Sequence, residues 1–107
     1  MTTVNNCLIA DNTAPMGAGL SSHASNGFSA ELYVNDSTVT SNTADLYLGG
    51  GLYVGYSASP AVSSMVMVNS IVEGNTANWS GGGIVGVASP ADEVLTRLTV
   101  DHSTVRY

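Results

Sequence analysis

The side chains best suited to chemistry in this sequence are the acidic pair Asp92-Glu93 and the nearby Arg97. Such a group could contact Ca²⁺ or line the groove of a carbohydrate-active enzyme. A calcium site takes roughly six to eight oxygen ligands, and no pattern in the sequence supplies the others. A solvated loop is therefore the favoured interpretation of the pair, and the carbohydrate-active groove is the alternative.

The remaining reactive side chains do not assemble into a catalytic or metal-binding set. His23 lies in a polar stretch, and no nucleophile, base and orienting carboxylate can be linked by their spacing. Cys7 is the only cysteine, so we expect a buried, inert thiol. No ligand set for zinc is present, and the glycine clusters lack the lysine of a phosphate-binding loop. The sequence predicts no catalytic residue, metal or cofactor.

Aromatic side chains offer a second kind of candidate, a surface for stacking sugars or binding a partner. Tyr53, Tyr56 and Trp79 lie in variable stretches of the chain, and with Asp92 and Glu93 they form the predicted set of ligand contacts. Counted along the repeats described below, the aromatic positions do not coincide, so the sequence does not define one shared aromatic face.

The charge balance excludes two classes of partner. The chain has no lysine, two arginines and eight acidic residues, which gives a formal net charge of −6. Nucleic-acid binding depends on Lys and Arg contacts to phosphates, and anionic membranes attract the same residues. No apolar run is long enough to span a bilayer. We expect neither nucleic-acid binding nor membrane insertion by this segment.

A repeat organises the elements that would position these residues. Asn-Thr-Ala occurs at 12–14, 42–44 and 75–77, and a glycine cluster with one aliphatic residue follows each copy. A period in this range is typical of solenoid proteins. The glycine clusters and their aliphatic residues are Gly17-Ala18-Gly19-Leu20, Gly49-Gly50-Gly51-Leu52 and Gly81-Gly82-Gly83-Ile84.

Further columns appear when the copies are aligned on Asn-Thr-Ala. Short stretches rich in Val, Ile and Thr, separated by Gly, Asn, Asp and Ser, indicate strands and turns, about three strands to a unit. A bend is expected at Asn6, Asp36, Asn69 and His102. The predicted inward columns are Val4/Val34/Met67/Val100, Ile9/Val39/Val72/Val105, Ala14/Ala44/Ala77, Leu20/Leu52/Ile84 and the small-residue set Cys7/Ser37/Ser70/Ser103.

These columns predict an all-β fold, a parallel β-helix in which each strand pairs with its copy in the next coil. The repeating Asn is expected to take the left-handed conformation at a bend and to bond the Asn above it. About three coils of 30–33 residues are predicted, with repeats at about 4–33, 34–66 and 67–99 and a partial one at 100–107. The stretches 21–30, 53–64 and 85–93 are expected to be irregular loops.

The steps Ile9-Ala10-Asp11-Asn12, Val39-Thr40-Ser41-Asn42 and Val72-Glu73-Gly74-Asn75, each followed by its glycine cluster, resemble right-handed parallel β-helix repeats. The likeness is greatest to the polymorphic outer membrane protein type of bacterial surface and secreted proteins, although Ile or Val stands where that type favours Phe. The resemblance implies an extracellular or cell-surface scaffold of the adhesin or autotransporter kind. Pectate-lyase-like enzymes share the fold, but their catalytic Arg and calcium-binding carboxylates have no recognisable match here.

Two functional hypotheses remain from the sequence. The favoured one is a non-catalytic stalk, adhesin or assembly module, a segment of a longer array that binds a glycan or surface protein or associates end to end through open coil edges. The alternative is a fragment of a polysaccharide lyase or hydrolase that uses Asp92, Glu93 and Arg97, because fold likeness alone carries no activity across.

Overall fold

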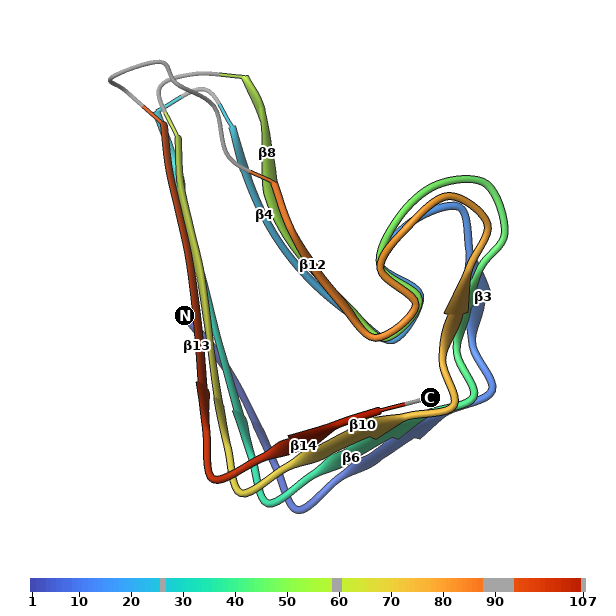
Figure 1. Cartoon of the computed structure of the whole chain (residues 1–107). Coiled ribbons are helices and arrows are strands. Elements are labelled where there is room, and N and C mark those ends of the chain that lie inside the picture. The colour runs from blue at the N-terminus through green and yellow to red at the C-terminus, as the bar shows by residue number, and fades with distance from the viewer. Residues whose placement is uncertain (26, 59–60, 88–93, 107) are drawn as a thin grey trace.

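The chain folds into a parallel β-helix. The computed structural model describes residues 1–25, 27–58, 61–87 and 94–106, and these contain strands but no helix. Figure 1 looks along the stack, so that equivalent strands of successive coils superimpose. The strands are β1 (Thr2–Asn5), β2 (Leu8–Ala10), β3 (Thr13–Ala14), β4 (Leu20–Ser25), β5 (Ser29–Asn35), β6 (Thr38–Thr40), β7 (Thr43–Ala44), β8 (Leu52–Ala58), β9 (Ala61–Val68), β10 (Ile71–Glu73), β11 (Thr76–Ala77), β12 (Ile84–Gly86), β13 (Val94–Asp101) and β14 (Thr104–Val105).

Every strand pairs with its copies one coil away, and all of these pairings are parallel. The first sheet has the order β1-β5-β9-β13, the second β2-β6-β10-β14, the third β3-β7-β11 and the fourth β4-β8-β12. A coil therefore has four strands rather than the three expected, because the Thr-Ala pair after each Asn forms a short strand of its own.

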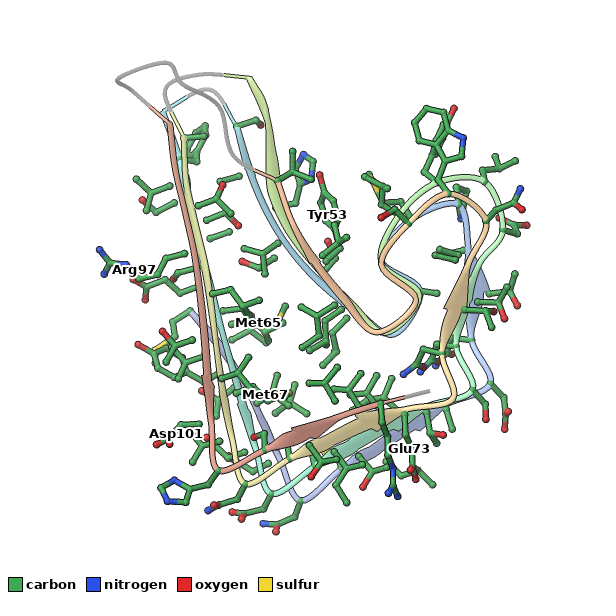
Figure 2. All side chains as sticks on the ribbon, in the orientation of Figure 1. Tyr53, Met65, Met67, Glu73, Arg97 and Asp101 are labelled. Atoms are coloured by element: carbon green, nitrogen blue, oxygen red, sulfur yellow. The ribbon has the colours of Figure 1, made fainter. Side chains whose placement is uncertain are left out.

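The predicted inward columns are confirmed in the middle of the stack, whereas their last members Val100 and Val105 are 43% and 45% exposed. Val34 pairs in register with Val4 and Met67, and Val39 pairs with Ile9 and Val72. Val34, Val39, Leu52, Met67 and Val72 are fully buried, and Figure 2 shows Met65 and Met67 pointing into the interior. The hydrophobic core is thus a stack of identical positions, which fixes the register of each coil on the one below.

The bend between the first and second sheets also follows the prediction. Asn6, Asp36, Asn69 and His102 have φ values between 45° and 52°, a left-handed conformation that Asn, Asp and His adopt more readily than other residues with a side chain. After each of the first three bends a backbone N–H donates to the serine hydroxyl one coil further on, for example at 3.1 Å from Cys7 to Ser37 and 3.0 Å from Ser70 to Ser103. Cys7 itself is exposed, contrary to the buried thiol expected, because it belongs to the outermost coil of the described stack.

The repeating asparagines form the expected ladder, but they are not the left-handed residues. Asn42 Nδ2 donates to Asn75 Oδ1 at 3.0 Å and Asn12 Nδ2 to Asn42 Oδ1 at 2.9 Å. The positive φ falls one residue earlier, at Asp11, Ser41 and Gly74. The bend residue and the ladder residue are therefore separate, which leaves the Asn side chain free to point along the stack.

Two of the three stretches expected to be loops are largely strand, and most of the third, 85–93, lies outside the described residues. β4 and β5 occupy most of 21–30, and β8 and β9 occupy most of 53–64. In Figure 1 the first and fourth sheets approach each other toward the upper left of the view. We call this tapering pair of sheets the arm. Small buried residues fill the narrow part of the arm: Ser22, Ala24, Ala61 and Ser63. Ser and Ala at these inward positions do not give the alternation of apolar and polar residues that predicts a strand. The strands form here because they pair with the equivalent strands of neighbouring coils.

Candidate functional site

Four exposed apolar residues lie on the connections between the third and fourth sheets. Tyr47 and Trp79 are 48% and 75% exposed, and their rings meet edge to face with centroids 5.7 Å apart. Met16 and Leu46, on the equivalent connections, are also exposed. We call these four residues, Met16, Leu46, Tyr47 and Trp79, the corner patch.

Backbone hydrogen bonds between coils hold the corner patch in place. The Trp79 N–H donates to the Tyr47 carbonyl at 3.0 Å, and the Tyr47 N–H donates to the Pro15 carbonyl at 2.9 Å. The next residues, Leu48 and Ser80, form a parallel bridge. The two aromatic rings therefore stand on a continuous ladder, although the connections that carry them differ in length.

Alignment on Asn-Thr-Ala missed this pair. Counted from Asn42 and Asn75, Tyr47 and Trp79 fall at different positions, which predicted no common face. Counted back from the first glycine of each cluster, Gly49 and Gly81, both lie two residues away. The glycine cluster sets the register of the corner, and the additional residue of the second connection is accommodated before Tyr47.

Tyr53 lies apart from the exposed pair. It is only 4% exposed, stacks on His23 with centroids 5.9 Å apart, and covers Gly55. Figure 2 shows it on the outer side of β8, opposite the turn of the corner. Its ring consequently packs the outer face of the fourth sheet, and among the predicted ligand contacts with described side chains Trp79 is the exposed one.

The remaining predicted contacts are less defined. Tyr56 belongs to β8, but its side chain lies outside the described part of the structure, as do Asp92 and Glu93. Arg97 is exposed on β13 and points away from the interior of the arm in Figure 2. The structure does not bring Arg97 and Trp79 together in one site, since they lie on the first sheet and on the corner connection.

Two pairs of titratable side chains lie on the surface of the described residues. His102 Nδ1 lies 2.8 Å from Asp101 Oδ1, and Arg106 lies 2.7 Å from Glu73 on the neighbouring coil. Within the described ranges no three His, Cys, Asp or Glu side chains converge. The same ranges contain no helix of the length and apolarity needed to cross a membrane.

Open cavities lie at both ends of the stack. The one at the C-terminal end has a volume of about 440 Å³ and is lined by Asn75, Gly82, Gly83, Ile84, Val105 and Arg106. At the opposite end a cavity of about 450 Å³ lies over the first coil, beside Val4 and Leu20. Both expose the core and the backbone edge of a coil.

No protein-family model, no curated protein and no solved structure matches this chain.

Proposed function

We propose that this chain is a non-catalytic β-helix scaffold segment of an extracellular or cell-surface protein, and that the corner patch binds a glycan. The observation that carries the proposal is the exposed Tyr47–Trp79 pair, held edge to face at 5.7 Å on a ladder of backbone hydrogen bonds. The surface setting comes from the resemblance to polymorphic outer membrane protein repeats and remains part of the proposal.

The chemistry of the corner patch suits a sugar. Tyr and Trp offer a flat apolar face together with a polar edge, so one side can stack on the C–H face of a pyranose ring while the other stays hydrated. Both side chains have few rotatable bonds, and binding therefore costs little side-chain entropy. The underlying coils fix the spacing of the two rings before a ligand arrives.

The charge near the corner patch favours a neutral glycan over a sulfated or uronic one. Asp45 is exposed on the connection that carries Tyr47, the chain has a net charge of −6, and neither arginine belongs to the corner patch. A polyanion would meet repulsion there without a cation to offset it.

The carbohydrate-active alternative has less support. Its arginine lies on the outside of β13, away from the corner patch, and its two carboxylates fall in the part of the chain that the structure does not describe. The experiment below distinguishes this alternative from glycan binding.

Trp79 makes the experiment direct, because it is the only tryptophan. Titration with neutral oligosaccharides should shift its fluorescence in a saturable manner, and Tyr47→Ala should weaken the binding roughly tenfold by removing one stacked ring of about 1.4 kcal/mol. Phe28→Ala is the matched control, because Phe28 is 72% exposed on a different connection.

Three results would count against the proposal. No shift with any neutral glycan would reject the corner patch as a glycan site, and saturation by a purified surface protein alone would reassign its ligand. Release of reducing ends or unsaturated products from a polysaccharide would support the enzyme instead.

A further inference from the structure

The third sheet carries a polar cavity that does not belong to the corner patch. The cavity has a volume of about 310 Å³ and lies on the side of the stack, over the second and third coils; we call it the side groove. Because this face looks sideways, a coil stacked on the third one would extend the side groove rather than cover it. The lining residues are Thr43, Ala44, Asp45, Thr76, Ala77 and Asn78.

The alternation of the strand directs four polar side chains into the side groove. Thr43 and Asp45 flank Ala44, which is fully buried. Successive side chains of a strand point to opposite faces, so the two flanking side chains point outward. On the next coil Thr76 pairs in register with Thr43, and Asn78 lies beside Asp45, since its N–H donates to the Ala44 carbonyl at 2.9 Å. Thr76 and Asn78 are both exposed.

The inner face of the third sheet is closed by the glycine clusters. A Cβ added to Gly50 would collide with the Thr76 carbonyl, and one added to Gly82 would lie 2.7 Å from the Asn75 carbonyl oxygen. Figure 1 shows the chain doubling back beside β3 after it leaves the third sheet. The side groove is therefore on the outer face, where a ligand can reach it.

The side groove offers hydrogen-bonding groups of three kinds. The Thr43 and Thr76 hydroxyls lie 3.1 Å apart and bond each other, which leaves one of them a free donor and both of them acceptor capacity. Among the described residues, the Asp45 carboxylate and the Asn78 amide have no hydrogen-bond or ion-pair partner. The carboxylate and the amide are thus available to an external ligand.

The side groove adjoins the corner patch on the same two coils. Asn78 immediately precedes Trp79, and Asp45 lies two residues before Tyr47, which is at most about 7 Å of extended chain. Backbone bonds between the coils fix both regions, since the N–H of Trp79 donates to Tyr47 at 3.0 Å just after that of Asn78 donates to Ala44. A ligand of two or more sugar units can therefore contact both regions at once.

We propose that the side groove is the polar subsite of the glycan site, in which Asp45 and Asn78 bind hydroxyl groups of the sugar unit next to the one stacked on Tyr47 and Trp79. This inference rests on the binding proposed for the corner patch. A carboxylate accepts from hydroxyl groups, whereas an amide both donates and accepts, so the two side chains suit neighbouring hydroxyl groups of one ring. The ligand is a neutral glycan of at least two units whose hydroxyl groups are unsubstituted.

The experiment is isothermal titration calorimetry of the full chain with neutral hexasaccharides of glucose, mannose and galactose, continued with the one that binds most tightly. Asp45→Ala should weaken its binding about tenfold, because a hydrogen bond to a charged group is lost, and Asn78→Ala about threefold. Glu31→Ala is the matched control and should leave the affinity unchanged, since Glu31 is an exposed carboxylate on the first sheet. Circular dichroism checks the fold of each variant.

A second ligand separates the hydroxyl contacts from ring stacking. The fully O-methylated form of the same hexasaccharide keeps the C–H faces of its rings but has no O–H donor for Asp45. It should bind the unmodified chain about tenfold more weakly than the parent hexasaccharide. Asp45→Ala should change its affinity less than about twofold, because the contact that this variant removes is already absent.

The outcomes distinguish the side groove from the corner patch. Equal affinity of the unmodified chain and of natively folded Asp45→Ala and Asn78→Ala would overturn the side groove, and a loss of affinity in Tyr47→Ala would still support the corner patch. An equally tight complex with the O-methylated hexasaccharide would also overturn the side groove. If none of the three hexasaccharides binds the unmodified chain, glycan binding itself is rejected, and the side groove with it.

Discussion

Each coil has two parts that are held together by different means. In the corner half, formed by the second and third sheets and the glycine clusters at 17–20, 49–52 and 81–84, the equivalent asparagines and serines and the glycine-cluster peptides of successive coils bond one another. In the arm the contacts change from coil to coil. Ser22 and Ser63 bond across the arm through their hydroxyls at 3.0 Å, and Thr96 bonds the Val87 carbonyl at 2.7 Å one level higher.

The difference between the corner half and the arm shows which positions of the repeat must keep the same residue type. The corner half must return the chain to the same place in every coil, so its turn residues and large apolar columns recur. The arm only has to close two sheets that converge, and any small residue that leaves no cavity is suitable there. Corner positions should therefore be sensitive to loss of volume, and arm positions to gain of volume.

The largest effect is expected from Leu52→Ala at the corner. Leu52 is fully buried between Leu20 and Ile84 and belongs to the main hydrophobic cluster. Its truncation should lower the free energy of unfolding by about 2–5 kcal/mol through lost burial and the cavity that remains. Urea denaturation followed by Trp79 fluorescence gives the value; a loss below about 1 kcal/mol would mean that the corner is not closely packed.

The asparagine ladder should show the next largest effect, and the effect should depend on position. Asn42 accepts from Asn12 and donates to Asn75 and to the Ile9 carbonyl, so Asn42→Ala leaves several polar groups unpaired and should cost about 2–3 kcal/mol. Asn12→Ala removes only an outer member and should cost about 0.5–1 kcal/mol. Equal losses of unfolding free energy for the two variants would argue against a larger contribution from the middle asparagine of the ladder.

In the arm the opposite change should be harmful. Ala24 is 3% exposed at the narrow part of β4, and Ala24→Leu should lower the free energy of unfolding by about 1–3 kcal/mol because the converging sheets have no room for the side chain. A neutral result would show that the arm can open, and would weaken the contrast between the two parts of the coil. Ser21→Leu, at an exposed position of the same strand, is the matched control.

The smallest effect is expected at the Glu73–Arg106 pair. Its two side chains are 34% and 64% exposed, so Arg106→Ala should change the free energy of unfolding by less than about 1 kcal/mol, and salt should reduce the difference further. A larger change that persists at high salt would mean that the Arg106 stem contributes packing over the open end.

The sequence was informative where large or conformationally special residues recur. The columns through Val39 and Leu52 and the bend at Asn69 could be predicted because β-branched residues, leucine and asparagine have clear structural preferences. The strands of the arm were missed because Ser22, Ala24 and Ser63 give no hydrophobic alternation. There the conformation depends on pairing with residues more than thirty positions away, which no local window contains.

The candidate site was harder to predict for a related reason. The Tyr47–Trp79 contact depends on counting from the glycine cluster, and the choice between two reference points becomes visible only when the coils are stacked. Cys7 was misjudged because its column is buried in the middle of the stack and open at the first coil. Position within the stack, rather than residue type, decides burial at the two ends.

The peptides of the glycine clusters share one direction along the stack, since the N–H groups of Gly17 to Leu20 and of Gly49 to Leu52 all donate to the next coil. This shared direction has an electrostatic consequence. A peptide unit carries a dipole of roughly 3.5 D, and four of them point the same way in each of the first two coils. Stacked in series they act as an α-helix does, with partial positive charge gathered at one end and partial negative charge at the other. The partial positive charge of this dipole faces the C-terminal end of the stack, opposite in sign to the net charge of −6 that the chain carries, and each further coil would lengthen the dipole while leaving its terminal charges unchanged.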